Sequence, residues 1–253
     1  MAIRKVFLIA RRVLNLMTFA RLSNGFQKIL SLDTALGPCC VGFLDTESGQ
    51  SVSRVVEAER AQAKILVPLI QDVLDEAGVS FEDLDAIVTT VGPGSFTGLR
   101  ISLSTARTLA LTLDIPLIGI ATLDALAYQI STEHKNKTFC IVLETKRADF
   151  YARFYDHDAK PRSNMVADNG LNILNQVHDK IDLLVSDTVD RFIGSIGEQA
   201  KQFDQIVSVS EIDPGVLASM ADKPELHREP EPIYLRGADV SQPKHKPRVL
   251  ADS

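Results

Sequence analysis

The stretch that decides the fold class covers residues 28–45 and reads KILSLDTALGPCCVGFLD. Two apolar runs, 28–32 and 39–45, flank the turn-forming pair Gly37-Pro38, which predicts two antiparallel strands joined by a tight turn. Residues 50–57 alternate polar and apolar side chains and predict a third strand. Three antiparallel strands therefore open the domain.

Helices and strands alternate after these three strands. The expected elements are a helix over 58–77 that ends at Gly78, a strand over 86–91, a helix over 96–113, a strand over 117–121 and a helix that begins at Thr122. The order strand, strand, strand, helix, strand, helix, strand, helix is that of a ribonuclease-H-like unit, as in actin, hexokinases and chaperone ATPases. The sequence thus predicts an α/β protein of the actin-like, ribonuclease-H-like class.

The second half repeats this order in reduced form. Strands are expected over 137–144, 150–156, 183–186 and 206–209, with a helix near 171–177. The predicted organisation is a first subdomain over 28–127, a second and truncated subdomain over 128–227, a segment 228–240 that docks back on the first, and a flexible tail over 241–253.

Composition and charge narrow the class of protein. Of the 253 residues, 45% are hydrophobic and 24% charged, an ordinary globular mix without an apolar run long enough to span a bilayer. Three cysteines, two of them adjacent, make neither a disulfide framework nor a zinc site and fit the cytoplasm. The net charge of −6 argues against tight direct binding to nucleic acid.

The first residues differ in composition from the rest. Residues 1–28 carry six basic side chains and no acidic one, whereas the remaining chain carries 21 basic and 33 acidic ones. Apolar residues at spacings of three and four would allow a basic amphipathic helix, similar to an organelle presequence or a surface-lying segment. The alternative is an upstream extension over 1–27 that lies outside the folded unit.

The most informative stretch for chemistry is VGPGSFTGLR, residues 91–100, between a buried strand and an uncharged helix. Its glycines allow backbone N–H groups to face a ligand, its hydroxyl side chains can cap the helix, and the helix dipole favours an anion. It has no Walker lysine, and it is neither a dinucleotide fingerprint nor a hydrolase elbow. The loop is either an anion site or a tight turn between strand and helix.

Asp33 and Thr34 stand where ribonuclease-H-like ATPases keep their first phosphate turn. The usual glycine-rich turn after the acid is missing, and the strand over 86–91 ends in threonines without a carboxylate. Asp33 is therefore either a metal-holding acid or a structural cap. The five histidines are too far apart in sequence for a metal pair, and we find no set of nucleophile, base and acid.

The two long helices carry more apolar residues than one buried face needs. In the helix over 96–113 only Arg100 and Arg107 are charged, and the helix over 58–77 has apolar residues on two flanks. We expect one flank to face the sheet and the other to face either a partner helix or the truncated second half.

Four motifs together resemble the bacterial TsaB (YeaZ) family. They are ILSLDTA at 29–35, GPGSFTGLR at 92–100, LIGIATL at 117–123 and PIYLR at 232–236, so the resemblance covers residues 28 to about 236. One departure is IVLETKRADFYARFY at 141–155, where many relatives have a strand ending in Asp-Ala-Arg followed by Glu-Val-Tyr.

The resemblance implies a cytoplasmic, non-catalytic relative of TsaD that supports threonylcarbamoyladenosine formation on tRNA. It implies heterodimerisation with TsaD, work with the ATPase TsaE, a homodimer when TsaD is absent, contact with tRNA only through the complex, and no membrane. ATP and magnesium would be used by the partner subunits, and the chain itself would need no cofactor or metal.

The same resemblance assigns residues to two sites. The partner interface would comprise Ile65, Leu66, Leu69, Val73, Arg100, Thr105 and Leu109. A nucleotide or anion loop would comprise Gly92, Gly94, Ser95, Thr97 and Gly98, together with Asp33 and Thr34. The alternative function is an independent ATPase or phosphotransferase that uses Asp33 and this loop. A glycoprotease-like metallopeptidase is disfavoured by the histidine count.

Overall fold

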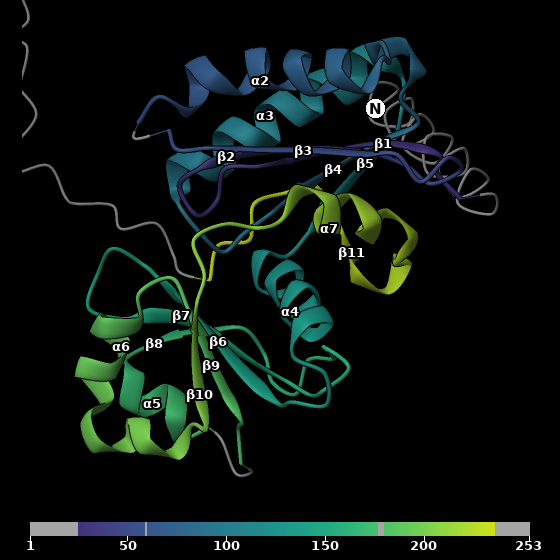
Figure 1. The fold of residues 1–253 in the computed structure, drawn as a ribbon. Helices are drawn as coiled ribbons and strands as arrows, with labels where there is room; N and C mark the ends of the chain where they lie inside the picture. The colour runs from purple at the N-terminus through teal and green to yellow at the C-terminus, as the bar shows by residue number, and fades with distance from the viewer. Residues whose placement is uncertain (1–24, 59, 177–179, 236–253) are drawn as a thin grey trace, which may run out of the picture.

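The computed structural model describes residues 25–58, 60–176 and 180–235, which form two β-sheets with helices on their faces (Figure 1). The first sheet has the strand order β11-β5-β4-β1-β2-β3. Its strands are β1 (Lys28–Asp33), β2 (Cys39–Asp45), β3 (Ser51–Val56), β4 (Ala86–Thr90), β5 (Leu117–Ile120) and β11 (His227–Arg228).

The pairing of the first sheet follows the sequence pattern. β1, β2 and β3 are antiparallel neighbours, and β4 and β5 run parallel to β1. The register pairs Leu32 with Thr89, so that the carboxyl ends of β1 and β4 lie side by side. This register brings Asp33 next to Thr90.

The second sheet repeats this pattern with the strand order β10-β9-β6-β7-β8. Its strands are β6 (Phe139–Glu144), β7 (Phe150–Tyr155), β8 (Val166–Asp168), β9 (Leu183–Ser186) and β10 (Gln205–Ser208). β6, β7 and β8 are antiparallel neighbours, whereas β9 and β10 run parallel to β6. Two related sheets in one chain, the second one reduced, confirm the actin-like α/β class.

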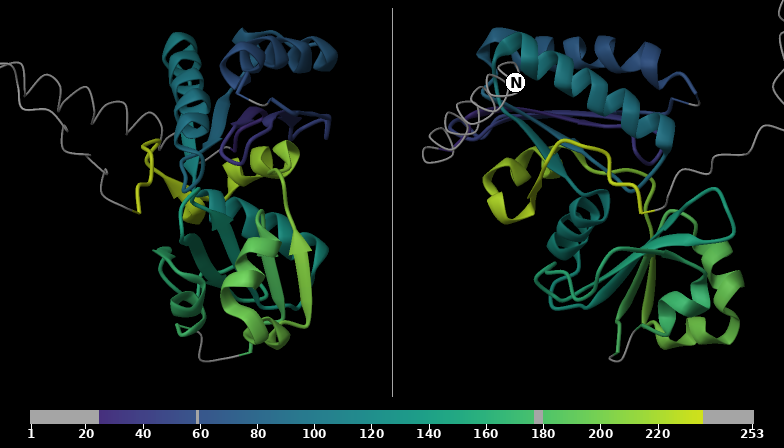
Figure 2. Two further views of the ribbon diagram at one scale, coloured as in Figure 1. Left: turned by 90° about the vertical axis from the view of Figure 1, so that its left-hand side faces the viewer. Right: turned by 180° about the vertical axis from the view of Figure 1, so that it is seen from behind.

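The helices cover the sheets in layers (Figure 2). α2 (Gln62–Ala77) and α3 (Phe96–Leu113) lie on one face of the first sheet, and α7 (Pro214–Ser219) lies on the other face. α4 (Thr122–Glu133) lies between the two sheets, and α5 (Gly170–Leu174) and α6 (Val189–Ile196) cover the outer face of the second sheet. The short 3₁₀ turns are 81–83, 197–202, 220–222 and 224–226.

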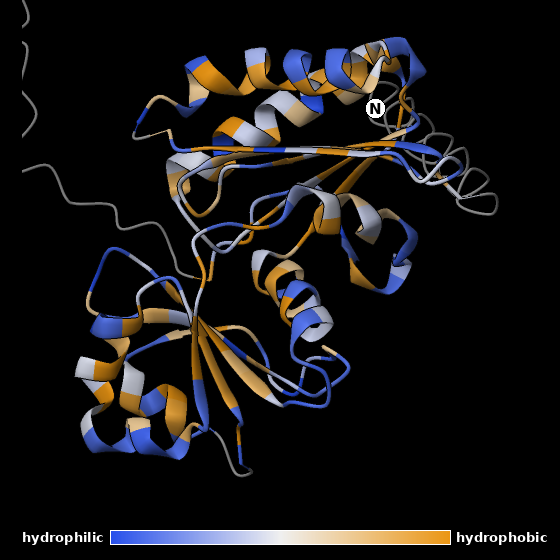
Figure 3. Ribbon diagram, in the orientation of Figure 1, coloured by the Kyte–Doolittle hydropathy of each residue, from blue (hydrophilic) through white to orange (hydrophobic). Residues whose placement is uncertain are grey.

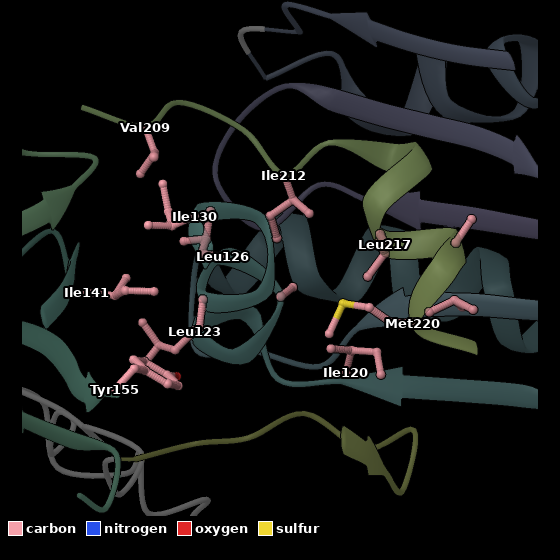
Figure 4. Close-up of a cluster of buried hydrophobic side chains, with 14 of the residues drawn as sticks. Ile120, Leu123, Leu126, Ile130, Ile141, Tyr155, Val209, Ile212, Leu217 and Met220 are labelled. Carbon is pink, nitrogen blue, oxygen red and sulfur yellow. The ribbon is translucent and has the colours of Figure 1, made fainter. Parts of the chain in front are cut away.

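Three apolar clusters form the core, and the hydropathy colouring shows orange residues in both sheets and in the helices that cover them (Figure 3). One cluster fills the space between the first sheet and α2 and α3, and another lies beneath α5 and α6. The third joins the two sheets around α4, where Leu123, Leu126 and Ile130 meet Ile141 and Tyr155 on one side and Leu217 on the other (Figure 4). Because burial of apolar surface drives folding, this third cluster holds the two subdomains together.

The predicted boundary of the second subdomain at residue 227 is wrong for its last residues. α7 packs against β1, β2 and β3 of the first sheet. Ser31 Oγ donates a hydrogen bond to the carbonyl oxygen of Pro214 at 2.6 Å. A Cβ on Gly42 would lie 2.8 Å from Pro214, so only glycine permits this approach. The chain returns because the apolar lower face of the first sheet would otherwise face water.

The chain after α7 also stays on the first subdomain. β11 pairs with β5, and the Ile233 N–H donates to the carbonyl oxygen of Val91 at 2.7 Å. The guanidinium of Arg107 donates to the carbonyl oxygen of Pro230. We name residues 227–235 the return segment; residues 236–240, which were also expected to dock, lie outside the described residues.

Some predicted elements differ in extent or lie outside the described part. The helix predicted over 58–77 begins at Gln62, after a turn in which the Ala61 N–H donates to the carbonyl oxygen of Ala58. The helix near 171–177 is α5, which ends at Leu174. The basic extension 1–24, residues 177–179 and the tail 241–253 lie outside the described residues. Within the described ranges, no helix has the length and apolarity that crossing a membrane requires.

Candidate functional site

The loop between β4 and α3 is bound to the turn that follows β1. Ser95 is the N-cap of α3 and accepts a hydrogen bond from the Gly98 N–H at 3.2 Å. The Ser95 N–H donates to the carbonyl oxygen of Ala35 at 2.8 Å, and the Thr34 hydroxyl donates to the carbonyl oxygen of Gly98 at 2.6 Å. The loop thus fixes the start of α3 on the end of β1.

Gly98 has a steric reason to be glycine. A Cβ at this position would lie 1.9 Å from the carbonyl oxygen of Thr34, far inside van der Waals contact. A Cβ at Gly94 would likewise lie 2.9 Å from the carbonyl oxygen of Ala35. The tight-turn reading of the motif therefore accounts for both glycines.

Asp33 is buried at the end of β1 and serves the same turn. Its carboxylate accepts a hydrogen bond from the Ala35 N–H at 3.2 Å and one from the Thr90 hydroxyl. Burial raises the pKa of Asp33 to about 6, against the lowering effect of these hydrogen bonds. Of the two roles that the sequence left open, the structure supports the structural cap.

A cleft of about 740 Å³ lies between the two subdomains. The first subdomain contributes the turn after β1 and the start of α3, the second contributes the β6–β7 hairpin, and the return segment contributes its last two residues. Its lining includes Gly94, Ser95, Thr97, Arg100, Glu144, Lys146 and Tyr234.

Only part of the proposed nucleotide loop reaches this cleft. Gly94, Ser95 and Thr97 line it, whereas Asp33, Thr34, Gly92 and Gly98 are not among its lining residues. Asp33 and Thr34 are fully engaged in the turn beneath the loop. The residues do not fit the first phosphate turn of an ATPase, and contact of Gly94, Ser95 and Thr97 with a nucleotide stays a prediction.

The second-subdomain side of the cleft carries paired charges. Glu144 lies 2.9 Å from Lys146 and 3.2 Å from Arg191, and these two cations hold the pKa of the Glu144 carboxyl below its usual range. Asp187 accepts a hydrogen bond from the Glu144 N–H at 2.8 Å, and burial raises its pKa to about 6. Asp187 also lines a neighbouring cavity of about 550 Å³ at the start of α6.

The mouth of the cleft carries aromatic rings beside an arginine. The Arg100 guanidinium lies 3.7 Å from the centre of the Phe96 ring, and Tyr234 lies 6.0 Å from the same ring. Phe96 and Tyr234 are each about half exposed. Arg100, which the sequence assigned to a partner interface, therefore also borders the cleft.

Cysteine and metal chemistry find no support in the described part of the chain. Burial raises the pKa of the Cys39 thiol to about 11 and raises that of Cys40 and Cys140 further still. No group of three or more His, Cys, Asp or Glu side chains with metal-binding geometry occurs among the described residues.

The prediction that Leu66, Leu69 and Val73 of α2 face a partner is wrong. All three are buried in the core of the first subdomain, with at most 6% of their surface exposed. Ile70 and Leu74, on the other apolar flank of α2, are also fully buried. Ile70 and Leu74 are covered because the sheet lies beneath α2 and α3 lies beside it, whereas Val67 on the same flank stays exposed.

The outward surface of α2 and α3 still carries apolar residues. Leu111 on α3 is 85% exposed and Val67 on α2 is 55% exposed. Of the residues assigned to the interface, Arg100 is exposed and Ile65, Thr105 and Leu109 are half-buried. Val67 and Leu111 are not among the residues assigned to the interface, because in helices that are apolar all round the pattern does not show which residue points outward.

Comparisons with known proteins show what the chain is similar to. A family model described as "TsaD: tRNA N6-adenosine threonylcarbamoyltransferase" matches residues 56–181. A protein of Buchnera aphidicola subsp. Schizaphis graminum named tRNA threonylcarbamoyladenosine biosynthesis protein TsaB is 36% identical over 123 residues, 49% of this chain and 58% of that protein. Its namesake in Escherichia coli K12 is 30% identical over 132 residues, 52% of this chain and 56% of that protein. The chain is thus similar to TsaB proteins over about half of its length.

A solved structure supports the fold of the chain. The structure of YeaZ from Pseudomonas aeruginosa matches with a TM-score of 0.67 at 22% identity, and the match covers 83% of this chain and 100% of that chain. The sequence matches cover less of each protein than this structural match does. They span less than three fifths of the length of the two curated TsaB relatives.

Proposed function

We propose that the chain is an accessory subunit of tRNA threonylcarbamoyladenosine formation that acts by binding TsaD and catalyses no step itself. Its relatives are named as TsaB proteins of this biosynthesis, and the matching family model is described as a transferase. The described residues hold no metal-binding group and no phosphate turn around Asp33. The similarity to TsaB proteins carries this proposal, and the outward surface of α2 and α3 supports it.

The proposed complex assigns the chemistry to other subunits. TsaD would carry the transfer, TsaE would hydrolyse ATP with magnesium, and this chain would need no cofactor of its own. It would contact tRNA only through the complex, work in the cytoplasm, and pair with a second copy of itself when TsaD is absent. The net charge of −6 agrees with an indirect role at tRNA.

The partner surface is proposed to centre on Leu111, Val67 and Arg100. Large exposed apolar side chains and arginines are typical of the residues that dominate binding at protein interfaces. Ile65, Thr105 and Leu109 would form the margin, since each is half-buried on the same two helices. Leu66, Leu69 and Val73 would act only by holding α2 in place.

Reconstitution tests the function. Threonylcarbamoyladenosine is measured by mass spectrometry on tRNA incubated with TsaD, TsaE, threonylcarbamoyl-adenylate and ATP, with and without this chain. Dependence of repeated turnovers on the chain supports the accessory role. Equal product without the chain contradicts it.

A substitution on α3, with a matched control on α5, tests the proposed partner surface. Leu111→Asp should weaken binding to TsaD at least tenfold with an unchanged melting temperature, because an exposed apolar contact is replaced by a charge. The matched control is Leu171→Asp on α5 of the second subdomain, where the leucine is 43% exposed and binding should be unchanged. Equal binding by the Leu111→Asp and wild-type chains would remove α3 from the interface.

An independent ATPase or phosphotransferase is the second candidate, because Gly94, Ser95, Thr97 and Lys146 line a cleft of about 740 Å³. Calorimetry with ATP and magnesium on the isolated chain distinguishes the two functions. Binding that is lost in Lys146→Met favours the enzyme, whereas the accessory role predicts no binding by the chain alone.

A further inference from the structure

A buried carboxylate joins three separate parts of the fold. Asp124 lies in the first turn of α4 and is only 2% exposed. Its Oδ1 accepts hydrogen bonds from the Tyr155 hydroxyl at 2.7 Å and from the Arg153 guanidinium at 2.8 Å, both on β7 of the second sheet. Its Oδ2 lies 3.6 Å from the guanidinium of Arg228 on β11, in the return segment.

These contacts link elements that the apolar core alone does not align. The cluster around α4 attaches the two sheets through aliphatic side chains, and such packing is non-directional. Hydrogen bonds from a guanidinium and a phenol to one carboxylate oxygen require defined directions. Asp124 therefore supplies an orientation where the apolar cluster supplies attachment.

The partners of Asp124 are themselves fixed. Tyr155 is fully buried and stacks on Phe139 with ring centres 5.5 Å apart. The Arg153 side chain is 12% exposed, and its Nε donates a second hydrogen bond to the carbonyl oxygen of Ser163 at 3.0 Å. Movement of β7 relative to α4 would break both hydrogen bonds to Asp124 together.

Burying a carboxylate costs free energy that well-packed apolar residues would not, so a buried ion pair is weak evidence of stability. Its best-attested use is to select one arrangement among several of similar packing energy. Asp124 is placed for such a role, since it lies at the junction of the two subdomains and the return segment.

We propose that Asp124, held by Arg153, Tyr155 and Arg228, is a clasp that fixes the angle between the two subdomains and thereby the width of the cleft between them. Arg228 ties the return segment into the same junction, because its backbone pairs with Gly119 of β5 while its side chain reaches Asp124. The clasp closes only when the second sheet and the return segment are both in place.

Distances between spin labels in the two subdomains test the clasp. Labels are placed on the full chain at Glu82→Cys in the first subdomain and Glu198→Cys in the second, both exposed positions. The native thiols are buried and do not compete for the label. Labelled chain is diluted with unlabelled chain, so that only distances within one copy are measured.

Asp124→Asn keeps the shape of the side chain and removes its charge. We expect a distance distribution at least twice as broad as that of the wild type, with a new longer component. Arg228→Met should broaden it less, because Arg153 and Tyr155 still hold the carboxylate. Glu76→Gln, which breaks the exposed Arg54–Glu76 ion pair, is the matched control and should leave it unchanged.

A label pair within the first subdomain, Glu47→Cys with Glu82→Cys, separates opening from loss of fold. Its distribution should stay narrow in every clasp variant that melts cooperatively. Unchanged inter-subdomain widths in folded Asp124→Asn and Arg228→Met would overturn the proposal and leave Asp124 with a role in stability alone. If Asp124→Asn does not fold, Arg228→Met decides, because its side chain is 40% exposed.

Discussion

Both subdomains begin with a β-hairpin whose first strand ends in an acidic residue, but the two acidic residues lie in opposite environments. Asp33 ends β1 and Glu144 ends β6, and each has a parallel neighbour, β4 or β9, at its side. Asp33 is buried beneath the loop over 92–98, and burial raises its pKa to about 6. Glu144 borders the cleft beside Lys146 and Arg191, which lower its pKa.

The covering loop explains the difference. In the first subdomain the turn after the acid is capped by Ser95 and Gly98, which bring the start of α3 onto it. In the second subdomain the hairpin residues 145–147 reach the cleft, and two cations meet the acid there. The same topology can thus close one strand end and leave the other accessible to a ligand or a partner.

Gly98→Ala should have the largest effect on stability, because it disrupts the loop that covers the end of β1. The new Cβ would meet the carbonyl oxygen of Thr34, and this neighbour is backbone that cannot turn aside. We expect a loss of more than about 3 kcal/mol in the free energy of unfolding, measured with urea. Gly194→Ala on α6 is the matched control. Nothing lies within 4 Å of its Cβ, so a gain of roughly 0.5–1 kcal/mol is expected. Similar stabilities for the two variants would contradict the close approach.

Asp33→Asn tests the buried acid through pH. Because the pKa of Asp33 rises from 3.8 to about 6 on folding, its contribution to stability is complete below pH 3.8 and is lost as the pH rises through about 6. The stability of the wild type relative to Asp33→Asn should therefore fall by up to about 3 kcal/mol over this interval. Urea unfolding at a series of pH values measures it, and the difference between the two chains cancels the raised pKa of Asp187. A flat difference would mean that Asp33 is not desolvated.

Glu144→Gln should give the opposite sign. A lowered pKa stabilises the folded chain above the unfolded value of 4.5 and is lost as the pH falls. The wild type should gain at most about 1 kcal/mol over Glu144→Gln as the pH rises through this range, because the carboxyl is partly exposed. Urea unfolding over the same series of pH values measures this change. If the stability difference changed with pH in the same direction for Asp33→Asn and Glu144→Gln, the contrast between the two acids would be wrong.

Lys146→Met should change stability least. Its side chain is 83% exposed and its ion pair with Glu144 lies in water. We expect a change within about 0.5 kcal/mol in the free energy of unfolding. A larger loss of stability would show that the end of β6 is packed as tightly as the end of β1.

Local pattern was enough to predict the strands and the long helices. Residues 28–45 contain both apolar runs and the turn between them, and the loop at 92–98 marks the boundary between β4 and α3. The class of the fold followed from the order of these elements. That Asp33 is a cap could not be decided, because the partner hydroxyl of Thr90 comes from another strand and meets it only through the register.

The sequence reading failed where contacts are long-range or where a pattern has no direction. α2 is apolar on two flanks, and nothing in its spacing shows that the sheet and α3 together bury Leu69 and Leu74. α7 has only six residues, although Asp213 followed by Pro214 is a recognisable helix start. β11 has two residues and is defined only by its neighbour β5.

The return of α7 to the first sheet has a consequence for synthesis on the ribosome. Ser31 and its partner Pro214 are 183 residues apart in the chain. The face of the first sheet that α7 covers therefore stays uncovered until Pro214 has been synthesised. Until then a nascent chain exposes the apolar surface that Leu217 and Met220 later bury. The subdomain translated first is therefore completed last, so that a ribosome stalled before α7 would hold an aggregation-prone and chaperone-dependent intermediate.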